Sequence, residues 1–247
     1  MLDLDNCLEI AKSATLLAGD YLKKQQTKKL KILSNSARDL KLQIDVDVEV
    51  IIKEYITSKS SLPILAEESG RTGELGDLFW VIDPLDGSSN FLRNIPISCV
   101  SIGLIQNLNP ILGVIYDFNN SDLYFAHKNS KAYLNDTEIS VSSLNQKKES
   151  TLVTGIPAKD NYSDIEFQDM ISDFQSWKKI RMIGSAAMAS IYVASGKAEA
   201  YKENGIFLWD VAAGAAIVES AGGKISIINH QPDYRVDANF TNKNLEK

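Results

Sequence analysis

The sequence has few of the side chains on which many metal centres and nucleophilic enzymes depend. It contains only two cysteines and two histidines in 247 residues. Neither His127 nor His230 lies in a recognisable motif, so a serine–histidine catalytic system and a histidine-rich zinc site are both disfavoured. Cys7 and Cys99 lie among apolar neighbours, which favours two buried thiols in a reducing cytoplasm, although one disulfide remains an alternative.

The sequence also lacks excess positive charge and long hydrophobic runs. Its 26 basic and 32 acidic residues give a net charge of −6, with no lysine–arginine block. A nucleic-acid partner is therefore not expected, whereas a small anionic substrate is possible because a bound metal can reverse the local field. The longest apolar runs, 99–105 and 211–218, are too short to span a bilayer, and residues 1–5 are acidic where a signal peptide is basic. We expect a soluble cytoplasmic protein without a membrane partner.

The common phosphate-binding loops are absent too. Neither G-x-x-x-x-G-K-[ST] nor G-x-G-x-x-G occurs in the chain, so any chemistry must rest on carboxylates and hydroxyls. Such oxygen ligands suit Mg²⁺, Mn²⁺ or Ca²⁺. Residues 45–49 resemble the start of an EF-hand, but Val50 and Ile56 stand where that loop needs glycine and glutamate.

The hydrophobic pattern predicts a mixed protein in which helices and sheets form layers. Its length fits one large domain or two tightly joined halves. Period-3.6 patterns predict helices over 4–22, 44–58, 163–177, 185–195 and 210–221, with a polar connector over 23–31. Short apolar runs predict strands over 62–66, 78–82, 97–106, 111–118, 123–127, 131–134, 151–156, 179–183 and 198–202, with a last strand over 225–228. The central strands are expected to form an antiparallel meander.

Acidic side chains stand at the ends of several apolar segments. Each has an ordinary explanation by itself, since Asp210 could cap a helix and Asp83 to Gly87 could form a turn. Strand ends converge at a sheet edge, however, and converging carboxylates repel each other unless a cation lies between them. The pattern therefore favours a cation site formed from these acids: Asp45, Glu67, Glu68, Asp83, Asp86 and Asp210.

The segment WVIDPLDGSSNF contains the best pair of acids. Pro84 fixes one backbone angle and Gly87 permits an unusual one, so Asp83 and Asp86 can be aimed at one point. The carbonyl of Leu85 could face the same cation. The sequence thus reads as a buried strand that delivers several oxygen ligands at its end.

Two segments of small residues could approach a phosphate ester. The backbone N–H groups after Gly87 could bind phosphate, and Ser88 could orient a water, although a simple helix cap explains Ser88 equally well. Residues 184–187, GSAA, offer a second helix start that a ligand could approach, but tight helix packing would also require small residues there.

These segments together resemble the inositol monophosphatase family of metal-dependent phosphomonoesterases over nearly the whole chain. The resemblance rests, in order, on AEES (66–69), DPLDGS (83–88), GSAA (184–187), ENG (203–205) and WDVAAG (209–214). It implies an α+β, layered α-β-α-β-α sandwich of the inositol monophosphatase and fructose-1,6-bisphosphatase type. It also implies a homodimer and a single domain over 1–247, with halves of about 1–145 and 150–247.

The resemblance further implies a role for individual residues. Glu67 and Asp83, with the Leu85 carbonyl, would hold one Mg²⁺, and Asp83, Asp86 and Asp210 a second. Asp45 matches the family's early aspartate, but Lys41-Leu42-Gln43-Ile44 replaces the usual Val-Thr-x-x before it, which leaves a third metal open. Mn²⁺ is an alternative ion. Asp45, Glu67 and Ser88 would be catalytic, and Glu68 would lie behind the ligands. The substrate would be bound by Asp86, Gly87, Ser88, Gly184, Ser185, Ala186, Glu203 and Asp210.

The implied activity is hydrolysis of a small phosphomonoester by a metal-activated water, without a phospho-enzyme. Asn90-Phe91 is similar to the inositol-type branch, and Glu203 should accept hydrogen bonds from a polyol, so an inositol-like polyol or sugar phosphate is favoured. Activity as a 3′(2′),5′-bisphosphate nucleotidase or a fructose-1,6-bisphosphatase remains an alternative. A non-catalytic, metal-binding or regulatory relative is the alternative from another class.

Overall fold

The computed structural model describes residues 2–28, 30–36, 39–156 and 163–245. Within these residues the helices are α1 (Leu4–Gln25), α2 (Gln43–Thr57), α3 (Ser88–Leu92), α4 (Asp164–Gln175), α5 (Ala186–Ala194) and α6 (Leu208–Ser220), with a 3₁₀ turn at Lys147–Glu149. No described helix is both long enough and apolar enough to cross a lipid bilayer.

The N-terminal half of the chain builds an eight-stranded sheet, with strand order β10-β9-β8-β7-β6-β5-β3-β4. Strands β5 to β10 form an antiparallel meander, as the short turns between them predict, and β3 runs parallel to β5. The strands are β3 (Ile64–Ala66), β4 (Gly70–Arg71), β5 (Leu78–Asp86), β6 (Cys99–Gln106), β7 (Asn109–Asp117), β8 (Asp122–His127), β9 (Ala132–Leu134) and β10 (Thr137–Ile139).

The C-terminal half builds a five-stranded sheet with order β12-β11-β13-β15-β14. Strands β12, β11 and β13 are parallel, whereas β15 is antiparallel to both β13 and β14. The strands are β11 (Thr151–Thr154), β12 (Lys179–Met182), β13 (Ala200–Phe207), β14 (Lys224–Ile228) and β15 (Arg235–Thr241). A separate hairpin, β1 (Ile32–Ser36) and β2 (Asp39–Leu42), precedes α2.

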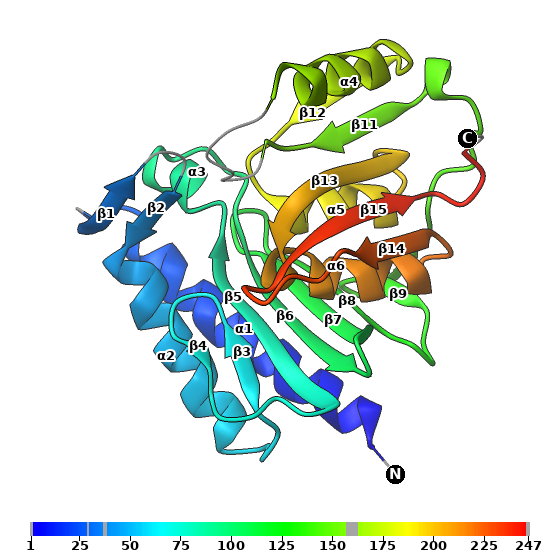
Figure 1. The fold of residues 1–247 in the computed structure, drawn as a ribbon. Coiled ribbons are helices and arrows are strands. Elements are labelled where there is room, and N and C mark those ends of the chain that lie inside the picture. The colour runs from blue at the N-terminus through cyan, green and yellow to red at the C-terminus, as the bar shows by residue number, and fades with distance from the viewer. Residues whose placement is uncertain (1, 29, 37–38, 157–162, 246–247) are drawn as a thin grey trace.

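The helices and sheets stack as layers in the order α-β-α-β-α (Figure 1). Alternate residues of β5 explain why both faces of the large sheet are covered. Trp80 and Ile82 belong to the core beneath α1 and α2, whereas Phe79 and Val81 belong to the core shared with α5 and α6. Helices α5 and α6 lie between the two sheets, and α4 lies on the outer side of the small sheet. The architecture is the expected α+β layered sandwich.

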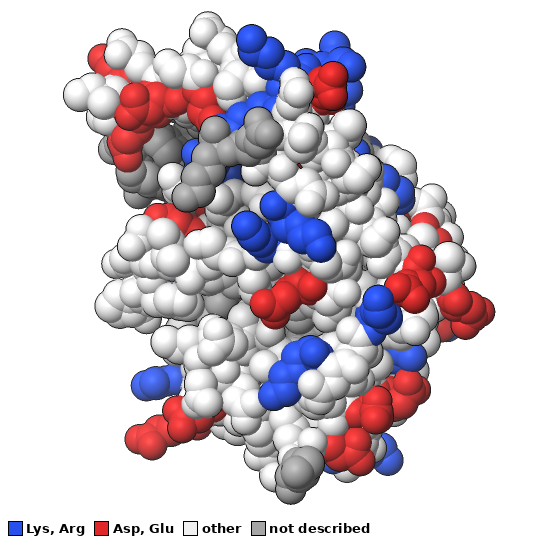
Figure 2. Space-filling view, turned by 90° about the vertical axis from the view of Figure 1, so that its right-hand side faces the viewer, with Lys and Arg blue, Asp and Glu red and all other residues white. Residues whose placement is uncertain are grey.

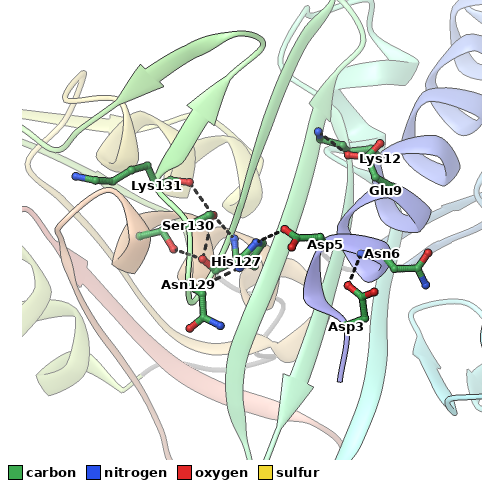
Figure 3. Close-up of polar contacts among 10 residues, drawn as sticks. Asp3, Asp5, Asn6, Glu9, Lys12, His127, Asn129, Ser130 and Lys131 are labelled. Carbon is green, nitrogen blue, oxygen red and sulfur yellow. Dashed lines mark hydrogen bonds and ion pairs between the residues drawn. The ribbon is translucent and has the colours of Figure 1, made fainter. Parts of the chain in front are cut away.

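The N-terminus of α1 is joined to the large sheet by a buried histidine, as Figure 3 shows. The Nε2 of His127 lies 3.1 Å from Oδ1 of Asp5, while the backbone N–H of Asn129 donates to its Nδ1 at 3.2 Å. Since Nδ1 accepts that bond, Nε2 carries the hydrogen that faces Asp5. His127 is therefore structural, and His230 is exposed, as expected for histidines outside any motif.

Three local expectations were wrong or incomplete. The segment 225–228 is not the last strand, because β15 follows it and lies between β13 and β14 in the small sheet. Helix α1 continues to Gln25 into the expected connector, of which Lys29 lies outside the described residues, and the hairpin β1–β2 was not expected. Cys7 and Cys99 are buried free thiols, so the disulfide alternative is excluded.

Candidate active site

Strand β5 ends in the two aspartates that the sequence singled out. The pairing of β5 with β6 shifts register between Asp83 and Asp86, because Pro84 and Leu85 form an irregularity there. Oδ1 of Asp83 accepts the N–H of Leu85 at 3.0 Å, which fixes the turn. Both acids are buried, with Asp83 1% exposed and Asp86 9% exposed.

Glu67 and Asp210 converge on Asp83 from two other elements. Glu67 follows β3, and its N–H donates to the carbonyl of Ile82 at 3.2 Å, which places it beside Asp83 on the parallel neighbour. Asp210 stands in the first turn of α6, where its Oδ2 accepts the N–H of Phe207 at 3.2 Å. The carboxyls of Glu67 and Asp210 lie close enough to that of Asp83 for each to raise its pKa. Three elements therefore bring three acids together.

The electrostatics of this group are those of crowded, desolvated acids. Burial raises the pKa of Asp83 well above its usual range, and the charges of Glu67, Asp86 and Asp210 raise it further. Desolvation followed by the charges of Asp86 and Glu203 raises the pKa of Asp210 in the same way. The side chain of Glu67 is exposed to solvent on one side, but many protein atoms surround its carboxyl group. Desolvation by these atoms raises the pKa of Glu67, and the charge of Asp210 raises it further. Each ionised form therefore needs a compensating positive charge.

Within the described residues, Lys41 acts electrostatically on Glu67 from the edge of the group but forms its ion pair with Glu68. None of the ion pairs among the described residues involves Glu67, Asp83, Asp86 or Asp210. Carboxylate and carbonyl oxygens are donors for hard divalent cations, so the chemistry of this set fits such an ion. Among the described residues, however, no three acid, histidine or cysteine side chains already have the geometry to hold a metal ion.

Asp45 and Ser88 form a second group beside these acids. Asp45 is 1% exposed and stands in the first turn of α2, where its Oδ2 accepts the N–H of Leu42 at 2.7 Å. Burial raises the pKa of Asp45 to about 7, although this hydrogen bond lowers it. The Ser88 hydroxyl lies 2.9 Å from the Leu85 carbonyl and 3.3 Å from Oδ1 of Asp45. Ser88 can thus donate its single hydrogen to either oxygen.

Asp86 links the large sheet to the start of α5. Its Oδ2 accepts both the Ser185 hydroxyl and the Ala187 N–H, each at 2.6 Å. Burial raises the pKa of Asp86 to about 6, and these hydrogen bonds oppose the shift. A cavity of about 260 Å³ opens here, and it is lined by six of the residues singled out in the sequence for substrate binding: Asp86, Gly184, Ser185, Ala186, Glu203 and Asp210.

Glu203 stands at the far side of this cavity. It is 9% exposed, and its Oε2 accepts the hydroxyl of the fully buried Tyr201 at 3.0 Å. Burial raises the pKa of Glu203 to about 7, a shift that the Tyr201 bond opposes and the charge of Asp86 reinforces. The sequence indicated Glu203 but not Tyr201, although their spacing of two along one strand puts both side chains on one face.

Glu68 has a cationic partner, although its charge also acts on Asp45 and Glu67. It forms an ion pair with Lys41, and its backbone N–H donates to Oε2 of Glu49 at 2.7 Å. Lys41 stands where the family pattern has valine, so this chain carries a cation of its own at the edge of the site. That Glu68 lies behind the proposed ligands stays a prediction.

Asn90 joins the two halves of the chain. Its side-chain amide donates to the carbonyls of Ile97 and Ile183, each at 2.8 Å. The adjacent Gly184 has a φ of +72°, and a Cβ there would lie 3.2 Å from the Asn90 amide. Asn90 thus positions the segment that lines the cavity, which the sequence did not indicate.

Comparison with known proteins assigns the chain to a family. Residues 3–246 match the model described as "Inositol monophosphatase family". The chain belongs to the inositol monophosphatase family. It is 38% identical over 239 residues to an inositol-1-monophosphatase from Synechocystis, covering 93% of this chain and 82% of that protein. It is 36% identical to the Nus factor SuhB of Xylella fastidiosa over 88% of this chain and 79% of that protein.

Solved structures of this family share the fold. The inositol monophosphatase from Anabaena superposes with a TM-score of 0.83 at 33% identity, covering 98% of this chain and 92% of that one. The extragenic suppressor protein SuhB from Bartonella henselae superposes with a TM-score of 0.85 at 28% identity, covering 94% and 93%. The layered arrangement is therefore the fold of inositol monophosphatases.

Proposed function

We propose that this chain is a Mg²⁺-dependent hydrolase of small phosphomonoesters, with an inositol-like polyol phosphate or a sugar phosphate as substrate. The observation that carries the proposal is the group of acids that converges on the buried Asp83, which has no ion-pair partner among the described residues and borders a cavity of about 260 Å³. Two Mg²⁺ ions would neutralise this charge. Mn²⁺ is the alternative ion, and Asp45 could support a third.

In this proposal the ligands are Glu67, Asp83, Asp86 and Asp210, with the carbonyl of Leu85. Bound divalent cations supply a nucleophile from water at neutral pH and offset charge on the phosphate. Ser88 and Asp45 orient the attacking water through their shared hydroxyl contact. The backbone N–H groups of Gly87 and Ser88, with those of residues 184–186, hold the phosphate. Attack forms a bond from water oxygen to phosphorus and breaks the ester bond, and the alcohol leaves with a proton.

Substitution of Asp83 by asparagine tests this assignment. We expect Asp83→Asn to lower kcat/KM for inositol 1-phosphate by at least about a hundredfold, since the proposed ligand of both ions loses its charge. Asp77→Asn is the matched control, because Asp77 is an exposed acid at the opposite end of the same strand. Phosphate release is measured in EDTA and with added Mg²⁺ or Mn²⁺. Near-normal Mg²⁺-dependent turnover by Asp83→Asn would overturn the proposal.

The rival substrates are fructose 1,6-bisphosphate and adenosine 3′,5′-bisphosphate. We favour a monophosphate because Glu203 accepts hydrogen bonds and would repel a second phosphate while ionised. The same assay, run with all three compounds, ranks them by kcat/KM. A clear preference for either bisphosphate would replace the polyol phosphate in this proposal.

A regulatory role is the second candidate, and the similarity to proteins named Nus factor SuhB favours it. Absence of metal-stimulated phosphate release across a panel of phosphomonoesters would support that role over catalysis. We also propose that the two halves act as one domain, because Asp83 and Asp210 come from different halves, and that the protein is a cytoplasmic homodimer. Light scattering measures the dimer directly, and the free thiols of Cys7 and Cys99 are consistent with a reducing compartment.

A further inference from the structure

Ser101, on strand β6, has a buried hydroxyl group without a hydrogen-bond partner. The residue is 1% exposed, and its Oγ forms no hydrogen bond with any of the described residues. A buried hydroxyl without a partner costs free energy, whereas an alanine at the same position would not. Packing would explain a small side chain at this position, but it does not explain the hydroxyl group.

The alternation of β6 places Ser101 on the face of the large sheet that α5 and α6 cover. Cys99 and Ile105 belong to the core shared with those helices, whereas Val100 and Ile102 belong to the core beneath α1 and α2. Successive side chains of a strand point to opposite faces, so Ser101 lies on the same face as Cys99.

Asp83 lies on this face too, directly opposite Ser101. The two residues are partners in the antiparallel pairing of β5 with β6, and Val81, two residues before Asp83, belongs to the core shared with α5 and α6. Residues that oppose each other in such a pair have Cβ atoms about 4.5–5.5 Å apart, so the serine hydroxyl is within reach of the carboxyl group. The partner of Ser101 on the other side, Ile115 of β7, has no polar atom in its side chain. Asp83 is therefore the side-chain acceptor that the sheet offers to Ser101.

Cys99 has the same relation to the second aspartate of β5. It is the register partner of Asp86, it is fully buried, and its Sγ lies 4.0 Å from Oδ2 of Asp86. A thiol is a weak hydrogen-bond donor. Strand β6 thus places one donor opposite each of the two aspartates, a thiol opposite Asp86 and a hydroxyl opposite Asp83.

We propose that Ser101 is a positioning residue of the cation site, whose hydroxyl donates a hydrogen bond to the Asp83 carboxylate when that carboxylate binds the ion. The bond would fix the rotation of the carboxyl group and so the direction in which its remaining lone pairs face the ion. Carboxylates that bind metals are commonly held by hydrogen bonds of this kind. The inference rests on the proposed Mg²⁺-dependent function and adds to it a residue that does not touch the ion.

Ser101→Ala separates this role from a structural one by two measurements. Without metal, removal of a hydroxyl that has no partner should leave the urea midpoint in EDTA unchanged or raise it. The dissociation constant for Mg²⁺ or Mn²⁺, measured by calorimetry without substrate, should rise at least about tenfold, as it does when partners of metal-binding groups are removed. Ser101→Cys keeps a weaker donor of similar size, so its dissociation constant should lie between those of the wild type and Ser101→Ala.

Ser150→Ala is the matched control. Ser150 is also fully buried, but it lies in the C-terminal half of the chain and its hydroxyl already donates to the carbonyl of Gln146 at 2.7 Å. This variant should lower the urea midpoint in EDTA and leave the dissociation constants for both ions unchanged.

The outcomes distinguish this inference from the proposed function. Equal dissociation constants for the wild type and Ser101→Ala would overturn the role of Ser101 and leave the proposed phosphatase function intact. A wild type that binds the ions but releases no phosphate would overturn the phosphatase function alone, and weaker binding by Ser101→Ala would then still support the role of Ser101. A wild type that binds neither ion would overturn both.

Discussion

Gly87 occupies a position in the proposed site where the fold leaves no room for a side chain. Its φ is +88°, and a Cβ there would lie 2.7 Å from the carbonyl oxygen of Ile97. We expect Gly87→Ala to lower the free energy of unfolding by more than about 2 kcal/mol, because the left-handed backbone alone costs roughly 1–2 kcal/mol in a non-glycine residue.

Gly76→Ala is the matched control for Gly87→Ala. Gly76 also has a positive φ, of +59°, but nothing lies within 4 Å of a Cβ at that position. Gly76→Ala should therefore lose stability only through its left-handed backbone. The difference between the urea midpoints of the two variants then measures the effect of the contact with Ile97. Equal losses of stability in the two variants would show that this contact is unimportant.

Among individual residues, the sequence indicated the acids but not the residues that position them. Asp83, Asp86 and Glu203 could be found because carboxylates in apolar surroundings are unusual and their motifs are specific. Tyr201 and Asn90 could not, because their roles depend on which strand or loop faces them, and no local pattern records that.

Helix α6 packs unusually closely against its neighbouring elements. Helix α6 carries Asp210, and its small residues let it lie directly on β6 and β7. A Cβ at Gly113 would lie 2.0 Å from the backbone oxygen of Ala213, whereas a Cβ at Gly214 would lie 2.3 Å from the Cβ of Ser190. The first contact is with backbone and the second with a side chain, so the two glycines should respond differently to compensating changes.

We therefore expect opposite results from two rescue experiments. Gly113→Ala should destabilise the protein by several kcal/mol, on the order of an overpacked core, and Ala213→Gly should not restore it because the clash is with backbone. Gly214→Ala should also destabilise, but Ser190→Gly should recover part of the loss. Urea denaturation of the single and double variants measures both cycles. Rescue of Gly113→Ala by Ala213→Gly would contradict this account of the helix contact.

Most elements could be predicted from sequence because their apolar residues recur with a clear period. The strands between residues 78 and 134 either alternate apolar with polar residues or consist of continuous apolar runs. Helices α1 and α2 each bury one apolar face. The hairpin β1–β2 mixes four apolar with five polar residues over two short strands, ILSNS and DLKL, and was not recognised from the sequence. Strand β15 does alternate, with Val236, Ala238 and Phe240 buried, but asparagine and aspartate between them resemble a loop. Its pairing with β13 and β14, rather than its composition, makes it a strand.

Several buried acids together should make the stability of the whole molecule depend on pH. Burial raises the pKa of Asp45 and Glu203 to about 7 and that of Asp86 to about 6, each above its value in an unfolded chain. The folded protein thus binds more protons, so these groups lower stability as pH rises from about 4 to 7. We expect the urea midpoint in EDTA to fall between pH 5 and pH 8.

Metal addition should reverse much of this loss. A cation that binds only the folded form stabilises it by mass action, and here it would also offset the ionised acids. The midpoints are compared in EDTA and in Mg²⁺ at both pH values, with Asp83→Asn as the control that lacks one acid. A midpoint in EDTA that stays level or rises with pH would contradict the assignment of these shifts.

Neither positive nor negative charge dominates the face of the molecule in Figure 2, where basic and acidic groups are interspersed with uncharged surface. The central acids Asp83 and Asp86 are buried, so they add little to the charge of any surface. The net charge of −6 is thus a poor guide to where an ion would bind.

The position of α6 between the two sheets also governs the order of events during protein synthesis. The large sheet is complete in the chain by residue 139, whereas α6 begins at residue 208. Until α6 leaves the ribosome, the face of β6 and β7 that it covers has no partner, and such exposed apolar surface favours aggregation. Asp83 and Asp86 are made early, but Asp210 joins them only when this middle layer docks. A chain that terminates before residue 208 would carry three of the four converging acids and lack Asp210.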